Sequence, residues 1–163
     1  MRFYFDPGDI SMLPTGGFVG VDPGRSSGGI AYIGPGDAPK LGWCRKISDM
    51  TDQDLWHVFA AVGRLQPSHA VLEKVSAMPG QGVSSTFKFG ASFGELKMAL
   101  TAIGVPFTLV TPATWQKSMK CLSKGDKNVT KSRAQQLYPK ANVTHATADA
   151  LLIATYAKTL HYI

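Results

Sequence analysis

Three carboxylates stand where a folded protein rarely places charge. Asp22 ends the apolar run FVGVD, Glu73 sits at or near the end of a second run, HAVLEKV, and Asp149 lies in ATADALLIA, which has no evident polar face. A buried carboxylate without a partner costs several kcal/mol or gives up its charge. If the three converge they repel one another, and divalent cations are the simplest compensation. Because the ligands would be hard oxygens, the pattern indicates magnesium or manganese rather than zinc.

Each of these acids also has an ordinary structural explanation. Asp22 begins Asp-Pro-Gly, a common turn sequence that also occurs at residues 6–8, although only the later copy follows an apolar strand and precedes a glycine-rich one. Glu73 could pair with a nearby lysine or arginine, and Asp149 could cap a helix or bridge to a neighbour. His145 precedes Asp149 by four residues and shares its helix face, where it could be a metal ligand, a base or simply the start of the helix.

The apolar pattern predicts an α/β domain that would position these acids. Strands are expected at residues 18–22, 27–33, 41–47, 69–75 and 107–110. Helices are expected at residues 49–65, 84–103, 111–115, 130–138 and 144–160. Three antiparallel strands followed by two parallel strands, each reached through a helix, make a mixed five-stranded sheet flanked by helices. Functional sites in such sheets gather at strand ends, where two of the three acids lie.

Length and composition are those of one folded domain. The 163 residues are enough to bury a core, and 44% hydrophobic against 17% charged residues excludes disorder as the main state. We expect a single domain over residues 17–163, preceded by an extension, arm or disordered segment over residues 1–16. Cys44 and Cys121 provide neither a disulfide framework nor a zinc site. With no apolar run of ~18 residues and no signal-peptide pattern at the start, we expect a cytoplasmic protein.

The net charge of +6 is concentrated in one segment. Residues 117–140 hold seven basic side chains and one acid, Asp126, whereas the rest of the chain has ten of each sign. Such a segment is either an ordinary solvated face or a surface for a polyanion, most simply nucleic acid. If metal ions occupy the three carboxylates, those acids no longer offset the lysines, which favours the second interpretation. The candidate phosphate contacts are Lys117, Lys120, Lys124, Lys127, Lys131 and Arg133.

The order of these motifs resembles the RuvC-type Holliday junction resolvases of the RNase H-like (retroviral integrase) superfamily. The resemblance covers about residues 18–156 and rests on GVDPG, GGIA, VLE and ADAL at residues 20–24, 28–31, 71–73 and 148–151. More narrowly, the segment at residues 73–90, with EKV, MPGQGVSS and FKFG, and VTPATW at residues 110–115 are similar to RuvC-like proteins of phages and prophages. If the protein is encoded by a phage, as this narrower resemblance implies, it would act in the cytosol of the phage's host.

The resemblance implies a reaction and a set of residues. Asp22, Glu73 and Asp149 would hold two Mg²⁺ ions, for which Mn²⁺ would substitute. The substrate would be a four-way DNA junction, cut by paired nicks that leave 5′-phosphate and 3′-hydroxyl ends, and the protein would be a homodimer. The family usually has a fourth ligand three residues before the last aspartate, but that position is Ala146 here, so His145 is the candidate replacement. The phage-like segment adds candidate DNA contacts at Lys74, Gln81, Ser84, Ser85 and Lys88.

One helix has two possible roles. RuvC proteins place an aromatic residue soon after the glutamate, against the junction bases, and this chain has none there; Phe87 and Phe89 are the alternatives, although their helical spacing favours the core. The helix at residues 84–103 could form the dimer interface or pack in the core of one chain. Its apolar residues are Phe87, Phe89, Phe93, Leu96 and Leu100.

Other functions stay open. A broader nuclease acting on flaps, forks and replication intermediates would need the same acids, and a protein that binds junctions without cutting them would need the same basic segment. The Asp-x-Gly hairpin also occurs in actin-like and sugar-kinase ATPases, but those proteins require a duplicated domain and a much longer chain.

Overall fold

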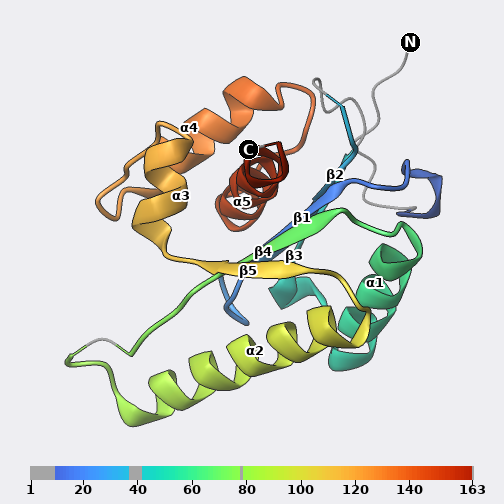
Figure 1. Ribbon diagram of the computed structural model, residues 1–163. Helices are drawn as coiled ribbons and strands as arrows, with labels where there is room; N and C mark the ends of the chain where they lie inside the picture. Colours follow the sequence, from blue (N-terminus) through green and yellow to red (C-terminus); the bar gives the residue numbers. More distant parts are fainter. Residues whose placement is uncertain (1–9, 37–41, 78, 163) are drawn as a thin grey trace.

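A mixed five-stranded sheet forms the centre of the computed structural model, which describes residues 10–36, 42–77 and 79–162 (Figure 1). The strand order is β3-β2-β1-β4-β5. Pairing is antiparallel between β1 and β2 and between β2 and β3, and parallel between β1 and β4 and between β4 and β5. The predicted arrangement of three antiparallel and two parallel strands is therefore confirmed. The strands are β1 Phe18–Asp22, β2 Gly29–Ile33, β3 Gly42–Lys46, β4 His69–Glu73 and β5 Phe107–Val110.

Helices cover both faces of the sheet, so the core has two layers (Figure 1). On one face lie α1 Asp52–Arg64 and α2 Val83–Ala102, and on the other α3 Pro112–Ser118, α4 Lys127–Leu137 and α5 His145–His161. Two short 3-10 turns, Ile10–Met12 and Ile47–Asp49, complete the fold. None of the helices in the described parts of the chain is long and apolar enough to cross a membrane.

The helices that carry candidate site residues are fixed by their caps. The side chain of Asp126 accepts a hydrogen bond from the backbone nitrogen of Asn128 at 2.9 Å, so α4 begins at Lys127. The sequence prediction of a start at Thr130 was wrong, because Asp126 was placed in a polar loop rather than at an N-cap. At α5, Thr144 and the residue three positions later form a reciprocal capping box, close to the predicted start.

α5 lies directly on β1 and β2 because glycines leave room for it. A Cβ atom at Gly20 would lie 2.1 Å from the carbonyl oxygen of Ala150, and one at Gly29 would lie 2.2 Å from that of Ala146. These alanines are four residues apart and therefore share a helix face. Since Asp149 precedes Ala150, this close approach brings its carboxylate to the end of β1.

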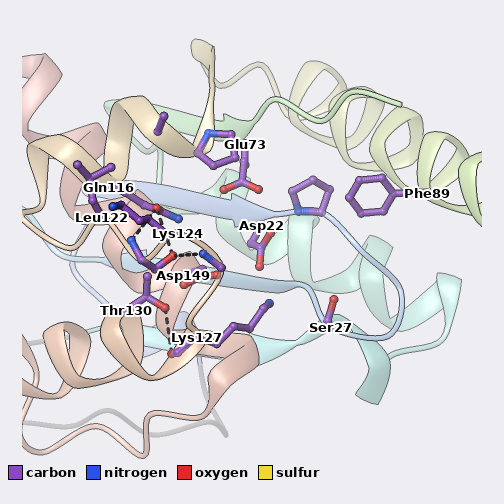
Figure 2. Close-up of a pocket in the computed structure, with 15 residues that line it drawn as sticks. Asp22, Ser27, Glu73, Phe89, Gln116, Leu122, Lys124, Lys127, Thr130 and Asp149 are labelled. Carbon is purple, nitrogen blue, oxygen red and sulfur yellow. Dashed lines mark hydrogen bonds between the residues drawn. The ribbon is translucent and has the colours of Figure 1, made fainter. Parts of the chain in front are cut away.

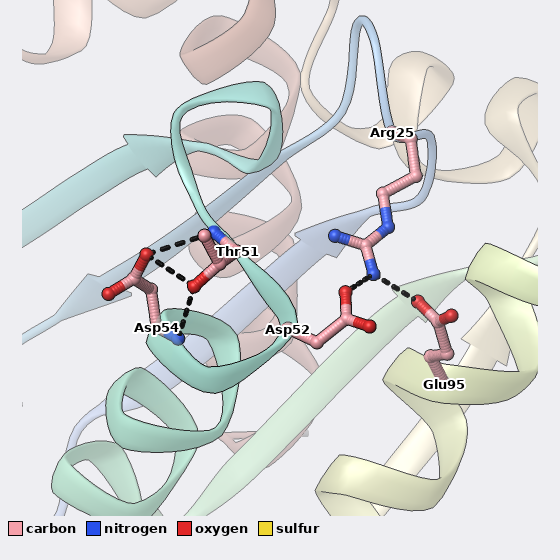
Figure 3. Close-up of polar contacts among 5 residues, drawn as sticks. All are labelled: Arg25, Thr51, Asp52, Asp54 and Glu95. Atoms are coloured by element: carbon pink, nitrogen blue, oxygen red, sulfur yellow. Dashed lines mark hydrogen bonds and ion pairs between the residues drawn. The ribbon is translucent and has the colours of Figure 1, made fainter.

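The turn that follows β1 is tied to both helices on the opposite face of the sheet. The guanidinium of Arg25 donates to Asp52, at the start of α1, and to Oε2 of Glu95 on α2 at 3.0 Å (Figure 3). α1 itself begins with a capping box between Thr51 and Asp54. One arginine therefore links the turn after Asp22 to the two helices.

The outer face of α2 differs from the sequence prediction. Leu96 and Leu100 are fully buried, and Phe93 packs against the same core layer, so these three residues belong to the core of one chain. Phe87, expected in the core from its spacing, has 76% of its surface exposed. This expectation was wrong because the first half of α2 extends past the sheet, where no strand covers it (Figure 1).

Packing on the domain begins before residue 17, where the domain was expected to start. Ile10 and Leu13 lie against the core layer under α1, and the hydroxyl of Tyr32 donates to the carbonyl of Pro14 at 2.5 Å. Residues 1–9 of the expected extension, and residue 41 of the predicted third strand, lie outside the described residues. The division of the chain after residue 16 stays a prediction.

Candidate active site

The three carboxylates line one pocket at the edge of the sheet where β1 and β4 end (Figure 2). Asp22 is the last residue of β1 and Glu73 the last residue of β4, and these strands are parallel neighbours. Asp149 comes from the second turn of α5, which crosses β1 through the glycine contact. The pocket has a volume of about 570 Å³. The structure thus brings together three acids that are up to 127 positions apart in the sequence.

These carboxylates resist ionisation in the folded protein. Burial, and the charges of Glu73 and Asp149, raise the pKa of Asp22 well above its usual range. Burial raises the pKa of Glu73 to about 7, although a hydrogen bond from Trp115 opposes the shift. Burial also raises the pKa of Asp149, against the effects of the Thr130 hydroxyl and two nearby cationic side chains. A site that holds three such anions together favours the binding of positive charge.

The donor set fits a divalent cation bound together with a substrate. Oδ1 of Asp149 is buried and has no hydrogen-bond partner among the described residues. This carboxylate oxygen is therefore available to bind a cation. In those same residues, no three His, Cys, Asp or Glu side chains could hold a metal ion by themselves. Mg²⁺ usually binds through one or two carboxylates plus substrate phosphates and water. The residues present therefore fit Mg²⁺ or Mn²⁺ ions whose coordination a bound phosphate group and water would complete.

Two lysines add positive charge to the pocket. Lys124 and Lys127 both line it. Lys127 lies near enough to lower the pKa of Asp22, Glu73 and Asp149 alike. Because its ammonium group lies near all three acids, Lys127 is also placed to attract a phosphate group toward them.

His145 does not line this pocket. It is exposed at the first residue of α5, and its Nε2 lies 3.2 Å from Oδ1 of Asn128. Its charge still lowers the pKa of Asp149, so the ring lies near the site without joining the lining. Its assignment as a replacement ligand stays a prediction that the geometry does not favour.

The basic segment, residues 117–140, lies along one side of the pocket. Besides the two lysines that line it, Lys120 and Arg133 line a second pocket of about 390 Å³ beside α4. Nε of Arg133 donates to the carbonyl of Met119 at 2.9 Å, which fixes the position of that guanidinium. Lys117 is exposed in the last turn of α3, and Lys131 is half-buried on α4.

The phage-like segment lies on another side of the pocket. It forms the connection from β4 to α2 and the first turns of α2 (Figure 1). Its predicted DNA contacts are all exposed: Lys74, Gln81, Ser84, Ser85 and Lys88.

Sequence reasoning missed several residues that shape the pocket. Nε1 of Trp115 donates to Oε2 of Glu73 at 2.7 Å. Phe89, for which the sequence left open a place against the junction bases or in the core, is half-buried and lines the pocket beside the turn that follows Asp22. The motif VTPATW contains a signal for the first of these contacts, because a tryptophan close to a strand end needs an acceptor for its N–H when it is buried. The other missed lining residues include Ser27, Gln116 and Thr130.

The raised pKa values predict how the stability of the metal-free protein depends on pH. The folded state binds protons more tightly than the unfolded chain between the usual pKa of Glu73, 4.5, and its folded value of about 7. The free energy of unfolding should therefore fall as pH rises through this window, on the order of 3 kcal/mol from Glu73 alone. Urea unfolding in EDTA at pH 4.5 and 7.5 measures the change.

A Glu73→Gln variant is the control for this pH dependence. The free energy of unfolding of this variant should fall less than that of the wild type between pH 4.5 and 7.5. Mg²⁺ should restore stability to the wild type at pH 7.5. A wild-type profile that is flat, or one that rises, would contradict the raised carboxylate pKa.

Comparison with solved structures identifies the fold of the chain. No protein-family model matches the chain, and no curated protein matches it by sequence. Among solved structures, the chain is similar to Thermus thermophilus RuvC in complex with a Holliday junction substrate, with TM-score 0.63, 18% identity, and coverage of 88% of this chain and 94% of that chain. A second Thermus thermophilus RuvC structure gives TM-score 0.58 and 19% identity, covering 88% and 95%. The chain therefore has the RNase H-like fold of RuvC.

Proposed function

We propose that the chain is a metal-dependent nuclease that resolves four-way DNA junctions by paired nicks. The observation that carries the proposal is the pocket where Asp22, Glu73 and Asp149 meet at the strand ends of a RuvC-type fold. One similar structure is a RuvC bound to a Holliday junction substrate. The narrower proposal of a phage-type protein rests on the sequence motifs at residues 73–90 and 110–115.

The chain's own residues would bind and orient the DNA for phosphodiester hydrolysis. Asp22, Glu73 and Asp149 would hold Mg²⁺ or Mn²⁺ ions, which when bound supply an activated water and stabilise the leaving 3′ oxygen. Ionisation of the three carboxylates is unfavourable without metal ions. With the cations bound, the carboxylates would be stable anions. Lys124 and Lys127 would attract the phosphate group and hold it over the acids. Cleavage of the bond between phosphorus and the 3′ oxygen leaves 5′-phosphate and 3′-hydroxyl ends.

Two groups of exposed side chains are proposed to bind the DNA backbone around the scissile phosphate. The basic segment would supply phosphate contacts along α3 and α4, and the start of α2 would supply contacts on another side. Phosphate contacts fix the position of a duplex without reading its sequence. Contacts on two sides of one pocket suit a branched substrate better than a single straight duplex.

We also propose that the protein acts as a homodimer through the outer α2 face, defined as Val83, Phe87 and Met98. These side chains are 88%, 76% and 63% exposed and share one side of the helix. Trp56 of α1, 53% exposed, lies beside Met98 in the same groove and extends this apolar surface. A four-way junction has approximate two-fold symmetry, so two symmetric sites would suit paired nicking.

A Phe87→Asp variant tests this interface. The wild type is expected to have twice the chain's 17.5 kDa by light scattering at working concentration, and the variant to have the mass of one chain, because a buried unpaired charge opposes association. Met12→Asp is the control, since Met12 is 78% exposed and belongs to the 3-10 turn Ile10–Met12 rather than to α2. A wild type that is monomeric, or a variant that stays dimeric, would rule out this interface.

A substrate panel tests the proposed function. With Mg²⁺, the wild type should nick a four-way junction at paired positions at least about tenfold faster than a three-way junction, a flap or a linear duplex, since symmetric sites suit the symmetric branch. Binding to the same substrates is measured in Ca²⁺. Equal cutting of all branched substrates would indicate a broader branched-DNA nuclease instead. Binding without cutting under every metal condition would indicate a junction-binding protein.

A further inference from the structure

The path of the chain after β5 returns a tryptophan to the end of β4. Glu73 and Val110 are partners in the parallel β4–β5 pair, so the two strands end side by side. Thr111 is the N-cap and Pro112 the first residue of α3, which therefore starts immediately beyond the sheet. One helical turn later, Trp115 lies over the end of β4.

The indole of Trp115 is completely buried and has a specific partner. Its relative exposure is 0%, and Nε1 lies 2.7 Å from Oε2 of Glu73. An indole N–H can only donate, so the glutamate oxygen must accept. At 2.7 Å the contact is at the short end of the range for N–H···O hydrogen bonds.

Packing also fixes the ring against the helix that carries the third acid. Trp115 belongs to the same core layer as Leu151 and Leu152 of α5, and Asp149 lies two residues before Leu151. The tryptophan therefore contacts the glutamate carboxylate at one end and the hydrophobic layer under α5 at the other. A flexible donor to Glu73, such as a surface lysine, would not link these two elements.

We propose that Trp115 is a positioning residue that holds the Glu73 carboxylate in the orientation from which it binds a divalent cation. The inference rests on the proposed function, because it assigns to Glu73 a metal to bind. Ligating carboxylates are commonly oriented by a second hydrogen-bonding group, and losing that group typically weakens metal affinity about 10- to 100-fold. Trp115 makes the contact from a rigid buried ring, so little orientational freedom is left to the carboxylate.

The test measures the affinity of the DNA-free protein for Mn²⁺, by the electron paramagnetic resonance of free Mn²⁺. Trp115→Phe keeps an aromatic ring and removes the N–H, and we expect about tenfold weaker binding. Trp43→Phe is the matched control, because Trp43 is also buried, at 2% exposure, but in the other core layer. It should bind Mn²⁺ within about twofold of the wild type.

A double-variant comparison separates positioning from general packing. In a Glu73→Gln background, Trp115→Phe should weaken Mn²⁺ binding no further, because the tryptophan acts through the glutamate. An equal loss with and without Glu73, or a loss no larger than that of Trp43→Phe, would overturn the inference.

A nuclear magnetic resonance measurement keeps the test decisive if Trp115→Phe does not fold. The indole ¹H–¹⁵N signal of Trp115 in the metal-free protein should move on Glu73→Gln and on addition of Mg²⁺ or the diamagnetic ion Ca²⁺. A signal that responds to neither change would overturn the inference. A signal that responds to Glu73→Gln in a protein that binds no divalent cation would overturn the proposed metal site and the positioning role with it, and would leave only a structural hydrogen bond.

Discussion

Glu73→Gln is expected to abolish Mg²⁺-dependent cutting of a four-way junction while junction binding in Ca²⁺ changes by less than about threefold. The amide keeps the shape of the side chain and can still accept from Trp115, but it carries no negative charge for a cation. Metal ions stabilise transition-state charge by several kcal/mol, so the rate of cutting should fall on the order of 10³-fold or more. Single-turnover cleavage of labelled junctions measures this rate.

The chain offers a matched control for this substitution, because it contains only two glutamates. Glu95→Gln makes the same chemical change on α2, where the carboxylate binds Arg25 and does not line the pocket. This variant should cut at close to the wild-type rate. If Glu73→Gln cuts within tenfold of the wild type, Glu73 is not a metal ligand in the reaction and the proposed active site is wrong.

Gly20→Ala is expected to give the largest loss of stability of any single added methyl group in β1. The new Cβ would lie 2.1 Å from the carbonyl oxygen of Ala150 and 2.2 Å from the nitrogen of Ala154, and backbone atoms cannot move aside alone. Overpacking of this kind costs about 3 kcal/mol, which lowers the melting temperature by roughly 6–12 °C for a chain of this size. Calorimetry or thermal circular dichroism measures the shift.

The same substitution should also disturb the active site, because a displaced α5 moves Asp149 away from Asp22. Cutting at a temperature where the variant is still folded should therefore fall more than its folded fraction. Gly90→Ala is the control: Gly90 lies within α2 with open space around its Cβ position, and alanine there should stabilise the helix slightly. An equal melting temperature for Gly20→Ala and the wild type would contradict the close packing of α5 on β1.

The sequence alone located the three acids because each breaks a local pattern. Asp22 and Glu73 end runs of buried residues, and Asp149 interrupts a helix that is apolar all round, so burial of charge was readable without any tertiary information. Strand positions were predicted closely for the same reason, since apolar runs of a few residues bounded by glycine and proline have few alternatives. Helix starts were less certain where the cap was a single polar side chain, as at Asp126.

Contacts between distant segments were decided only by the tertiary structure. The hydrogen bond from Trp115 to Glu73 joins residues 42 positions apart, and it depends on the pairing of β4 with β5 and on the start of α3. The outward direction of Phe87 depends on how far α2 extends past the sheet. The distance of His145 from the pocket depends on where α5 begins relative to α4.

The amino-acid sequence by itself determined which acids interrupt or end apolar segments, which strands and helices carry them, and where the positive charge is concentrated. These properties follow from composition and periodicity over short stretches of chain. Only the tertiary structure decided that the acids share one pocket, because that requires α5 to pack against Gly20 and β4 to pair beside β1. Side-chain spacing encodes which face of an element is apolar, but the distance between two elements is set by the volumes that meet at their contact.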